Sequence, residues 1–335
     1  MIYIMCPANS YTGGPTLAHQ LCSVLNKNGI SATMWYYCNP WKKNRIDPVH
    51  DDYKNFKNPY IMDTPDDNET NTIVALESKT PILRRFRYSK RTIWWMSVDN
   101  FYLNMGNIVE VIKRKYFGFK PTLEYCMKFK NKAKYQVFKD EDIIHFVQSE
   151  YARLFLINEG VNKDRIFDLS DYIEDEVIEA HQLVNKYNRS NTILYNPKKG
   201  YAFTQEIMKA NPQYNWTPLI NMSKTVVIDT LLKSKLYIDF GTHPGKDRFP
   251  REAILCGCCL ITGRRGAAAN DVDIPIFSKY KIDDSLENIP RISEVIKDIM
   301  DNYESRVKDY EEYCLRTLDE KRHFEQEAIL AFGGK

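Results

Sequence analysis

Short apolar runs that alternate with helical patterns constrain the fold of this chain more than any other feature of its sequence. Five such runs occur in the first half, at residues 2–5, 32–37, 72–76, 92–98 and 143–148. After the first of them, Leu17, Leu21 and Leu25 recur at the spacing of a helix, and Gly29 is a typical stop. Strands that alternate with helices predict a parallel sheet covered by helices on both faces.

The same pattern restarts after a polar and charged stretch. Strands are predicted at 192–195, 215–220, 236–240 and 259–262, with helices at 203–210, 225–232 and 250–256 and long helices from 292 onward. A length of 335 residues fits about two domains. We therefore predict an α/β fold with two Rossmann-like, doubly wound domains facing a cleft. The expected parts are an N-terminal domain at 1–172, an interdomain crossing at 173–190, a second domain at 191–300 and C-terminal helices at 301–335.

Composition excludes several classes of protein. Hydrophobic residues make up 43% of the chain and charged residues 27%, which is too apolar for a mainly disordered protein. The apolar runs are far shorter than the ~20 residues of a spanning helix, and the N-terminus lacks the basic segment of a signal peptide. Eight cysteines without paired spacing do not indicate a disulfide framework. These features together predict a cytoplasmic protein.

Positive charge is concentrated in one region. Residues 79–135 hold fourteen Lys or Arg against three acids, although the whole chain has a net charge of only +3. Such a region suits an anionic partner: a membrane surface, nucleic acid or a phosphorylated substrate. Within it, 116–135 mixes lysines with Tyr and Phe, as at a lipid headgroup interface. The two interpretations are peripheral attachment to the inner face of a membrane and an ordinary solvated helix.

The richest candidate loop follows the strand predicted at 236–240. Ligands of doubly wound sheets bind outside the carboxyl ends of the strands. Lys246 and Arg248 stand beside a predicted helix start, where unpaired N–H groups favour an anion. Glu252, in the expected first turn of that helix, suits a sugar or ribose diol; its alternative role is to complement the helix dipole. His243 is interpreted as a contact to phosphate or sugar, or as a plain loop histidine.

Two further basic loops follow strands of the same half. Lys198 and Lys199 come after its first predicted strand, and Arg264 and Arg265 come after its last. Guanidinium groups between glycines suit a diphosphate, because they donate two parallel hydrogen bonds to its oxygens. Three basic, glycine-containing loops at one edge of a sheet therefore predict a site for a phosphorylated ligand.

No metal or cofactor is expected. The run Cys256-Gly257-Cys258-Cys259 has no second Cys or His cluster that would complete four ligands at the usual spacing. Its place between a predicted helix and a buried strand suits small apolar side chains. The basic loops are expected to neutralise a diphosphate in place of a divalent ion.

Several of these segments resemble a known family. The similarity to the donor-nucleotide domain of GT-B-fold glycosyltransferases covers residues 237–240, 249–253, Cys256-Gly257 and 259–263. The resemblance implies that Glu252 holds the nucleoside ribose of a nucleotide-sugar donor, and that Lys198 and Lys199 grip its diphosphate. One departure is Pro244, which stands eight positions before Glu252, where many retaining members carry a first glutamate.

The N-terminal half holds two further candidates. Gly13 and Gly14, ahead of a predicted helix, resemble the family's N-domain loop that faces the donor. Asp99 follows the strand predicted at 92–98, so it is expected at the carboxyl edge of the sheet. An inverting glycosyltransferase needs a base for the acceptor hydroxyl, and Asp99 suits that role. Its alternative role is to cap a helix that starts near Phe101.

The resemblance implies a glycosyltransferase that moves a sugar from a nucleotide-sugar donor to a glycan or lipid-linked glycan acceptor. General similarity to bacterial surface-polysaccharide enzymes, of the capsule and O-antigen type, favours that pathway. Two alternatives stay open: a nucleotide-sugar epimerase of the same architecture, and a nucleic-acid-binding protein that uses the basic region. The glycine-containing loops after strands argue against nucleic acid as the partner.

Overall fold

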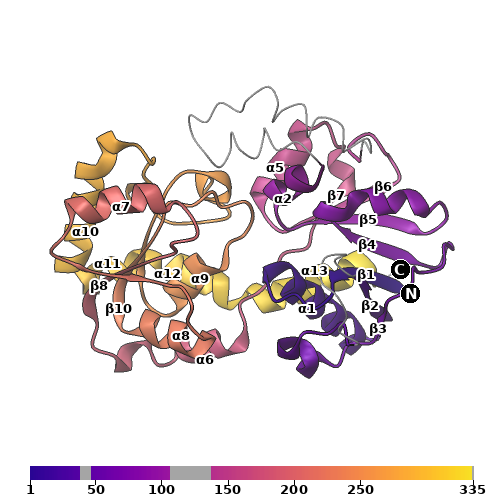
Figure 1. The fold of residues 1–335 in the computed structure, drawn as a ribbon, viewed down its shortest axis with the longest axis horizontal. Coiled ribbons are helices and arrows are strands. Elements are labelled where there is room, and N and C mark those ends of the chain that lie inside the picture. Colours follow the sequence, from indigo (N-terminus) through magenta and orange to yellow (C-terminus); the bar gives the residue numbers. More distant parts are fainter. Residues whose placement is uncertain (38–46, 106–136, 334–335) are drawn as a thin grey trace. The chain divides into compact units, whose positions relative to one another are not determined.

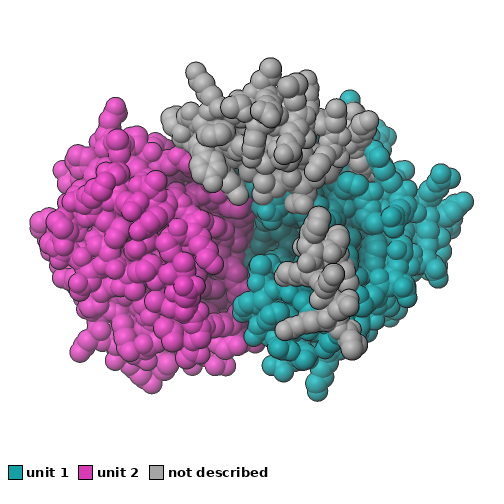
Figure 2. Space-filling view, in the orientation of Figure 1, with its two compact units in different colours: residues 1–171, 322–335 teal, residues 172–321 magenta. Residues whose placement is uncertain are grey.

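The structure is a computed structural model that describes residues 1–37, 47–105 and 137–333. Two compact units make it up (Figure 2). Unit 1 comprises Met1–Asp171 together with Arg322–Lys335, and unit 2 comprises Tyr172–Lys321. Each unit is described by itself below.

The chain crosses between the units twice, after Asp171 and after Lys321. Residues 173–190, which we expected to form the crossing, belong to unit 2 and contain α6 (Asp175–His181). The last helix, α13 (Glu320–Phe332), begins in unit 2 and continues in unit 1. The C-terminal helices are therefore shared between the units.

Unit 1 is built on seven parallel strands in the order β3-β2-β1-β4-β5-β6-β7 (Figure 1). The strands are β1 (Ile2–Pro7), β2 (Ala32–Tyr37), β3 (Tyr60–Ile61), β4 (Thr72–Leu76), β5 (Lys90–Trp95), β6 (Ile143–Val147) and β7 (Ile166–Asp168). The apolar runs predicted five of them. They missed β3 and β7, because edge strands of two and three residues are too short to show a periodicity.

Both faces of this sheet are buried. Residues 73–75 of β4 are all fully buried, although successive side chains in a strand point to opposite faces. In β5, Trp95 packs against Phe101 and Phe155 on one face, while Trp94 stacks on Phe324 on the other. These rings come from helices that cover the sheet. Within the described residues of unit 1, the helices are α1 (Gly13–Lys27), α2 (Val98–Met105), α5 (Glu150–Asn158) and most of α13.

Strand β5 is shorter than predicted. It ends at Trp95, and α2 begins at Val98, so the strand expected at 92–98 was wrong at its end. The physical reason is a cap: the Ser97 hydroxyl accepts a hydrogen bond from the Asn100 backbone N–H at 3.3 Å, which starts a helix inside the apolar run. Asp99 therefore lies in the first turn of α2.

Unit 2 is built on four parallel strands in the order β11-β10-β8-β9. The strands are β8 (Ser190–Tyr195), β9 (Asn215–Pro218), β10 (Ser234–Asp239) and β11 (Cys259–Thr262). The sequence neighbours β8 and β9 lie side by side, but β10 lies on the other side of β8, so the winding reverses between β8 and β10. The loops after these two strands meet at this switch point, where ligands of doubly wound sheets bind.

Helices enclose the sheet of unit 2. They are α6, α7 (Tyr201–Ala210), α8 (Lys224–Leu232), α9 (Arg248–Leu255), α10 (Ile289–Asp301), α11 (Tyr303–Arg306) and α12 (Glu311–Leu318). Between α9 and β11, Cys256, Cys258 and Cys259 are fully buried in the core. Burial raises the pKa of the Cys258 thiol to about 12, and its sulfur donates to the Leu231 carbonyl at 3.2 Å. These thiols are neutral core side chains.

The helices of the described residues include none that is both long and apolar enough to cross a membrane. The basic and aromatic segment at 116–135 lies outside the described residues. Of the basic region at 79–135, the structure describes 79–105.

Candidate functional site

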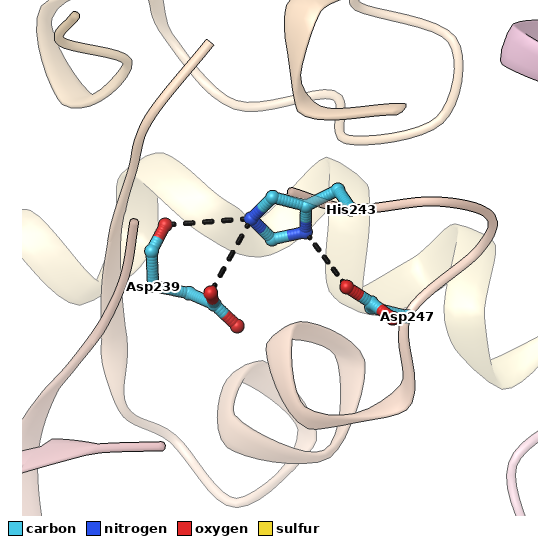
Figure 3. A group of neighbouring side chains, drawn as sticks. All are labelled: Asp239, His243 and Asp247. Atoms are coloured by element: carbon cyan, nitrogen blue, oxygen red, sulfur yellow. Dashed lines mark hydrogen bonds and ion pairs between the residues drawn. The ribbon is translucent and has the colours of Figure 1, made fainter. Parts of the chain in front are cut away.

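The loop after β10 folds around a buried histidine. His243 is fully buried, and its φ of 43° is a left-handed value that costs energy in a residue with a side chain. Its Nδ1 lies 3.0 Å from Asp247 Oδ2, and its Nε2 lies 3.5 Å from Asp239 Oδ1 (Figure 3). The ring therefore faces two carboxylates and is shielded from solvent.

These contacts favour the protonated form of His243. Burial alone would lower its pKa, but Asp239 and Asp247 outweigh burial and raise the pKa of His243 above its ordinary value. Burial also acts to raise the pKa of Asp247, yet His243 and Lys199 hold that pKa far below its usual range. Lys199 Nζ lies 2.7 Å from both oxygens of Asp247. Asp239, His243, Asp247 and Lys199 thus form one cluster of acidic and basic side chains.

Asp239, His243 and Asp247 are the three residues of the described chain whose ligand atoms lie close enough together to hold a metal ion. The carboxylates contact opposite nitrogens of the ring, as Figure 3 shows, so the imidazole ring bridges them. Lys199 already neutralises Asp247. The ligand atoms of this cluster contact one another and Lys199 in the folded chain.

Two Asp-x-Asp sequences occur in the chain, a spacing that can bind divalent ions. In 140–142, Arg91 lies 2.8 Å from Asp140 and 3.1 Å from Asp142. In 271–273, Asp271 pairs with the buried Lys281 at 2.8 Å. Both sequences are engaged in ion pairs.

Glycines bring the three predicted loops into contact. A Cβ on Gly200, whose φ is 61°, would lie 2.2 Å from the Phe240 carbonyl oxygen. A Cβ on Gly266, whose φ is 56°, would lie 2.1 Å from the His243 carbonyl oxygen, which also accepts a 2.9 Å hydrogen bond from the Ala267 N–H. Only glycine permits such backbone approach. The loops after β8, β10 and β11 therefore pack together, as the sequence predicted.

Most of the predicted phosphate-binding cations are already paired with carboxylates. The pairs are Lys199–Asp247 (2.7 Å), Lys246–Glu320 (2.9 Å), Arg248–Glu174 (3.1 Å) and Arg265–Asp284 (3.0 Å). Lys198 and Arg264 differ: both are exposed, and neither forms an ion pair with a described residue. Arg264 instead donates to the carbonyl of Lys281 at 3.0 Å. Lys198 and Arg264 are thus the cations most available to an anion.

Glu252 lies later in its helix than we expected. Asp247 is the residue before α9, which begins at Arg248, so the expected start at 250 and the placement of Glu252 in the first turn were wrong. Pro250 falls within the first turn, where a missing N–H costs no helical hydrogen bond. Glu252 stands one turn further on, and its Oε1 lies 3.3 Å from Arg248 Nε. Its side chain is 14% exposed, which leaves it accessible to a ligand.

The candidates of unit 1 lie near the carboxyl edge of its sheet. Gly13 and Gly14 begin α1, and a Cβ on Gly14 would lie 3.5 Å from the sulfur of Met96. Asp99 is only 3% exposed. The cap of α2 is Ser97, so the capping role considered for Asp99 belongs to Ser97. The structure places these residues in unit 1 and all the other predicted site residues in unit 2.

One buried acid of unit 1 escaped prediction. Glu77 follows β4 directly, is 4% exposed, and accepts a 3.3 Å hydrogen bond from the Met96 backbone N–H. Burial raises the pKa of Glu77 to about 7. Such a shift is typical of functional carboxyl groups. Its position right after a predicted strand was the signal that could have found it.

Comparisons with known proteins agree on the fold. No family model and no curated protein matches the sequence. Among solved structures, a glycosyltransferase from Rickettsia africae ESF-5 is 12% identical, with a TM-score of 0.58 over 99% of this chain and 97% of that one. HepE from Anabaena, in complex with UDP and glucose, is 10% identical, with a TM-score of 0.54 over 100% and 99%.

A third structure supports the same conclusion. WaaG, a glycosyltransferase involved in lipopolysaccharide biosynthesis, is 11% identical, with a TM-score of 0.56 over the whole of both chains. The likeness extends over the full length in each case. The chain therefore has the GT-B fold, with two Rossmann-like units, as the sequence predicted.

Proposed function

We propose that this chain is a glycosyltransferase that binds a nucleotide-sugar donor in unit 2 and transfers the sugar to a glycan or lipid-linked glycan. The observation that carries the proposal is the meeting of three basic, glycine-containing loops at the switch point of a GT-B-fold sheet. Solved structures of similar fold include HepE in complex with UDP-glucose, with a TM-score of 0.53.

The donor diphosphate needs positive charge when it leaves. Lys198 and Arg264 supply it in the proposed site, because they are exposed and form no ion pair within the described chain. Preorganised cations around a leaving diphosphate stabilise the charge that develops in the transition state. The cluster around His243 sets the shape of the loop that carries the remaining donor contacts.

Glu252 is the proposed contact to the donor ribose. A carboxylate accepts hydrogen bonds from both hydroxyls of a diol. Arg248, 3.3 Å away, holds the carboxylate in one orientation. The position also matches the resemblance found in the sequence.

The acceptor is proposed to bind in unit 1. Asp99 lies in the first turn of α2, and Glu77 lies at the end of β4 and accepts from the Met96 N–H that precedes α2. Gly13 and Gly14, at the start of α1, are proposed as contacts to the donor. Asp99 is proposed as the base for the acceptor hydroxyl. Because it is 3% exposed, this role requires that the first turn of α2 uncover its carboxylate. Peripheral attachment at the inner face of a membrane, for a lipid-linked acceptor of a surface polysaccharide, is proposed from the basic region at 79–135.

A thermal-shift screen tests the proposal. The full chain is heated with UDP, GDP, CMP and dTDP sugars, because a ligand of the native state stabilises it by roughly 2.7 kcal/mol at a hundredfold excess over Kd. We expect one nucleotide class to raise the midpoint, and glycosyl transfer to be detected with that donor. A midpoint unchanged by all four classes at millimolar concentration would contradict the proposal.

A further inference from the structure

An acidic residue beside each crossing of the chain pairs with the loop that follows β10 or with the first residue of α9. Glu174 lies just after the first crossing, and Glu320 lies just before the second. Arg248 contacts Glu174, while Lys246 contacts Glu320. The two connections between the units are thus both tied to one loop of the proposed donor site.

Glu320 holds this loop through a buried arginine. Arg251 is fully buried, and its Nη1 donates to Glu320 Oε2 at 2.6 Å. The same guanidinium donates to the carbonyls of Asp247 and Lys246, at 3.2 and 3.1 Å. Glu320 therefore fixes the backbone at the two residues where the loop turns into α9. The Asp247 side chain then holds His243 by an ion pair.

Glu174 holds the other side of the loop. Its Oε2 lies 3.1 Å from Arg248 Nη2, and Arg248 Nε lies 3.3 Å from Glu252 Oε1. Lys224 also contacts Glu174, which anchors the carboxylate from α8. The orientation of Glu252 thus depends on Arg248, and the orientation of Arg248 depends on Glu174.

Burial separates the Arg251–Glu320 pair from ordinary surface ion pairs, and the Arg248–Glu174 pair is half-buried. The side chains of Arg251 and Glu320 are 0% and 8% exposed, and those of Arg248 and Glu174 are both 21% exposed. Exposed pairs contribute little, whereas removal of one partner of a buried pair leaves an uncompensated charge. A loop with such pairs has one strongly preferred geometry.

We propose that Glu174 and Glu320 are positioning residues that couple the two crossings to the donor loop. The inference rests on the proposed function, because it takes Glu252 and the loop at 241–252 as donor contacts. Coupling between two sites is reciprocal. Donor contacts at the loop therefore stabilise the chain at both crossings, and a change at either crossing alters the geometry that the donor meets.

The first experiment measures amide hydrogen exchange of the full chain without ligand. The substitution Glu320→Gln keeps the size of the side chain and removes its charge, and Glu304→Gln is the matched control on an exposed glutamate of unit 2. We expect exchange at 241–247 to be about tenfold faster in the Glu320 variant, since a hydrogen bond to a charged group is lost. The control should match the parent.

A second pair of variants tests the contacts that run from Glu174 through Arg248 to Glu252. Glu174→Gln should speed exchange at the start of α9, while Glu179→Gln, on an exposed glutamate of the helix α6 that follows Glu174, should not. If Glu320→Gln does not fold, Glu320→Asp is used in its place, because it keeps the charge on a shorter side chain. Its amide exchange at 241–247 should be faster than that of the parent but slower than that of a disordered loop. Loop exchange equal to that of the parent in both Gln variants would overturn the proposal.

The final arm adds ligand. The nucleotide sugar that binds the parent in the thermal-shift screen should protect amides at 172–176 and 319–323, and Glu320→Gln should lose the second of these protections. A sugar that binds without protecting either crossing would overturn the coupling. If none of the four nucleotide classes binds, the proposed function is wrong, and the exchange rates without ligand still decide whether the two acids position the loop.

Discussion

The ammonium of Lys199 lies 2.7 Å from both oxygens of Asp247, so a lysine expected to grip phosphate is used to hold the loop that follows β10. Its neighbour Lys198 is exposed and forms no ion pair with a described residue. Two adjacent lysines of one loop therefore have different roles. One stabilises the site, and the other is available to the ligand.

This difference predicts opposite effects of two alanine substitutions. Lys198→Ala should weaken binding of a nucleoside diphosphate about tenfold, as expected for a charged hydrogen bond, without changing stability. Lys199→Ala leaves Asp247 with one fewer cation and should lower the free energy of unfolding by about 1–3 kcal/mol. Calorimetric titration and urea unfolding measure the two effects. Equal losses of affinity and stability in both variants would contradict the assignment.

The same logic separates the two arginines after β11. Among the described residues, Arg264 donates to carbonyls alone, whereas Arg265 pairs with Asp284 at 3.0 Å. Arg264→Ala should reduce affinity for a nucleoside diphosphate more than for the bare nucleoside. Arg265→Ala should reduce both affinities alike, because it acts through the loop and not through the phosphates. Competition binding with both ligands gives the comparison.

Glu252→Gln should weaken nucleotide-sugar binding while the fold stays intact. The variant keeps the size of the side chain but removes the negative charge that accepts the ribose hydroxyls. Glu206→Gln, an exposed glutamate in α7, is the control. Donor affinity equal in the two variants would remove Glu252 from the site, provided that both melt like the parent.

Much of the fold could be predicted because parallel strands buried on both faces appear as continuous apolar runs. The errors occur where something other than an apolar run sets the bounds of a strand. Ser97 ends β5 early by capping α2, which apolar content alone does not show. Edge strands β3 and β7 are too short to produce a pattern.

The sequence predicted the three loops of the site, but not which of their cations are paired with acids and which are available to a ligand. Basic and glycine residues after strands identified the loops. Which cations are already paired depends on acids far away in sequence, such as Glu320, which pairs with Lys246, and Glu174, which pairs with Arg248. Nothing in the sequence around Lys246 or Arg248 indicates that these distant acids are their partners. The charge of His243 likewise depends on Asp239, a strand residue that no motif singled out.

The raised pKa of His243 predicts a pH dependence of stability. The folded chain binds this proton more tightly than the unfolded chain, whose histidine titrates near 6.5. The stabilisation is therefore complete below about pH 6.5 and is lost as pH rises through the folded pKa. The pKa of Asp247 is held far below this range, so its carboxylate does not titrate there.

Urea unfolding between pH 6 and 9 checks this prediction. The stability difference between the parent and His243→Gln should be largest at pH 6 and should shrink as pH rises. His323→Gln, an exposed histidine in α13, should follow the parent at every pH. A difference that stays constant across the range would show that His243 is not charged in the folded chain.

Glu77 predicts a substitution that stabilises the protein. Its pKa is raised by burial from 4.5 to about 7, so the folded state holds the proton more tightly than the unfolded state does. The free energy of unfolding should therefore fall as pH rises from about 4.5 to about 7, and stay lower above that. At 1.36 kcal/mol per pKa unit, the cost of the buried charge is about 3 kcal/mol above pH 7.

Glu77→Gln removes this cost, because the amide is neutral at every pH and its oxygen still accepts the Met96 N–H. The variant should be more stable than the parent by up to about 3 kcal/mol at pH 8, and the difference should vanish near pH 4.5. Glu69→Gln, on an exposed glutamate of the same unit, should change neither value. A Glu77 variant that is less stable than the parent at pH 8 would mean that the ionised carboxylate is favourably bound in the folded chain. In that case burial does not dominate its titration, and Glu77 is part of a charged network at the edge of the sheet.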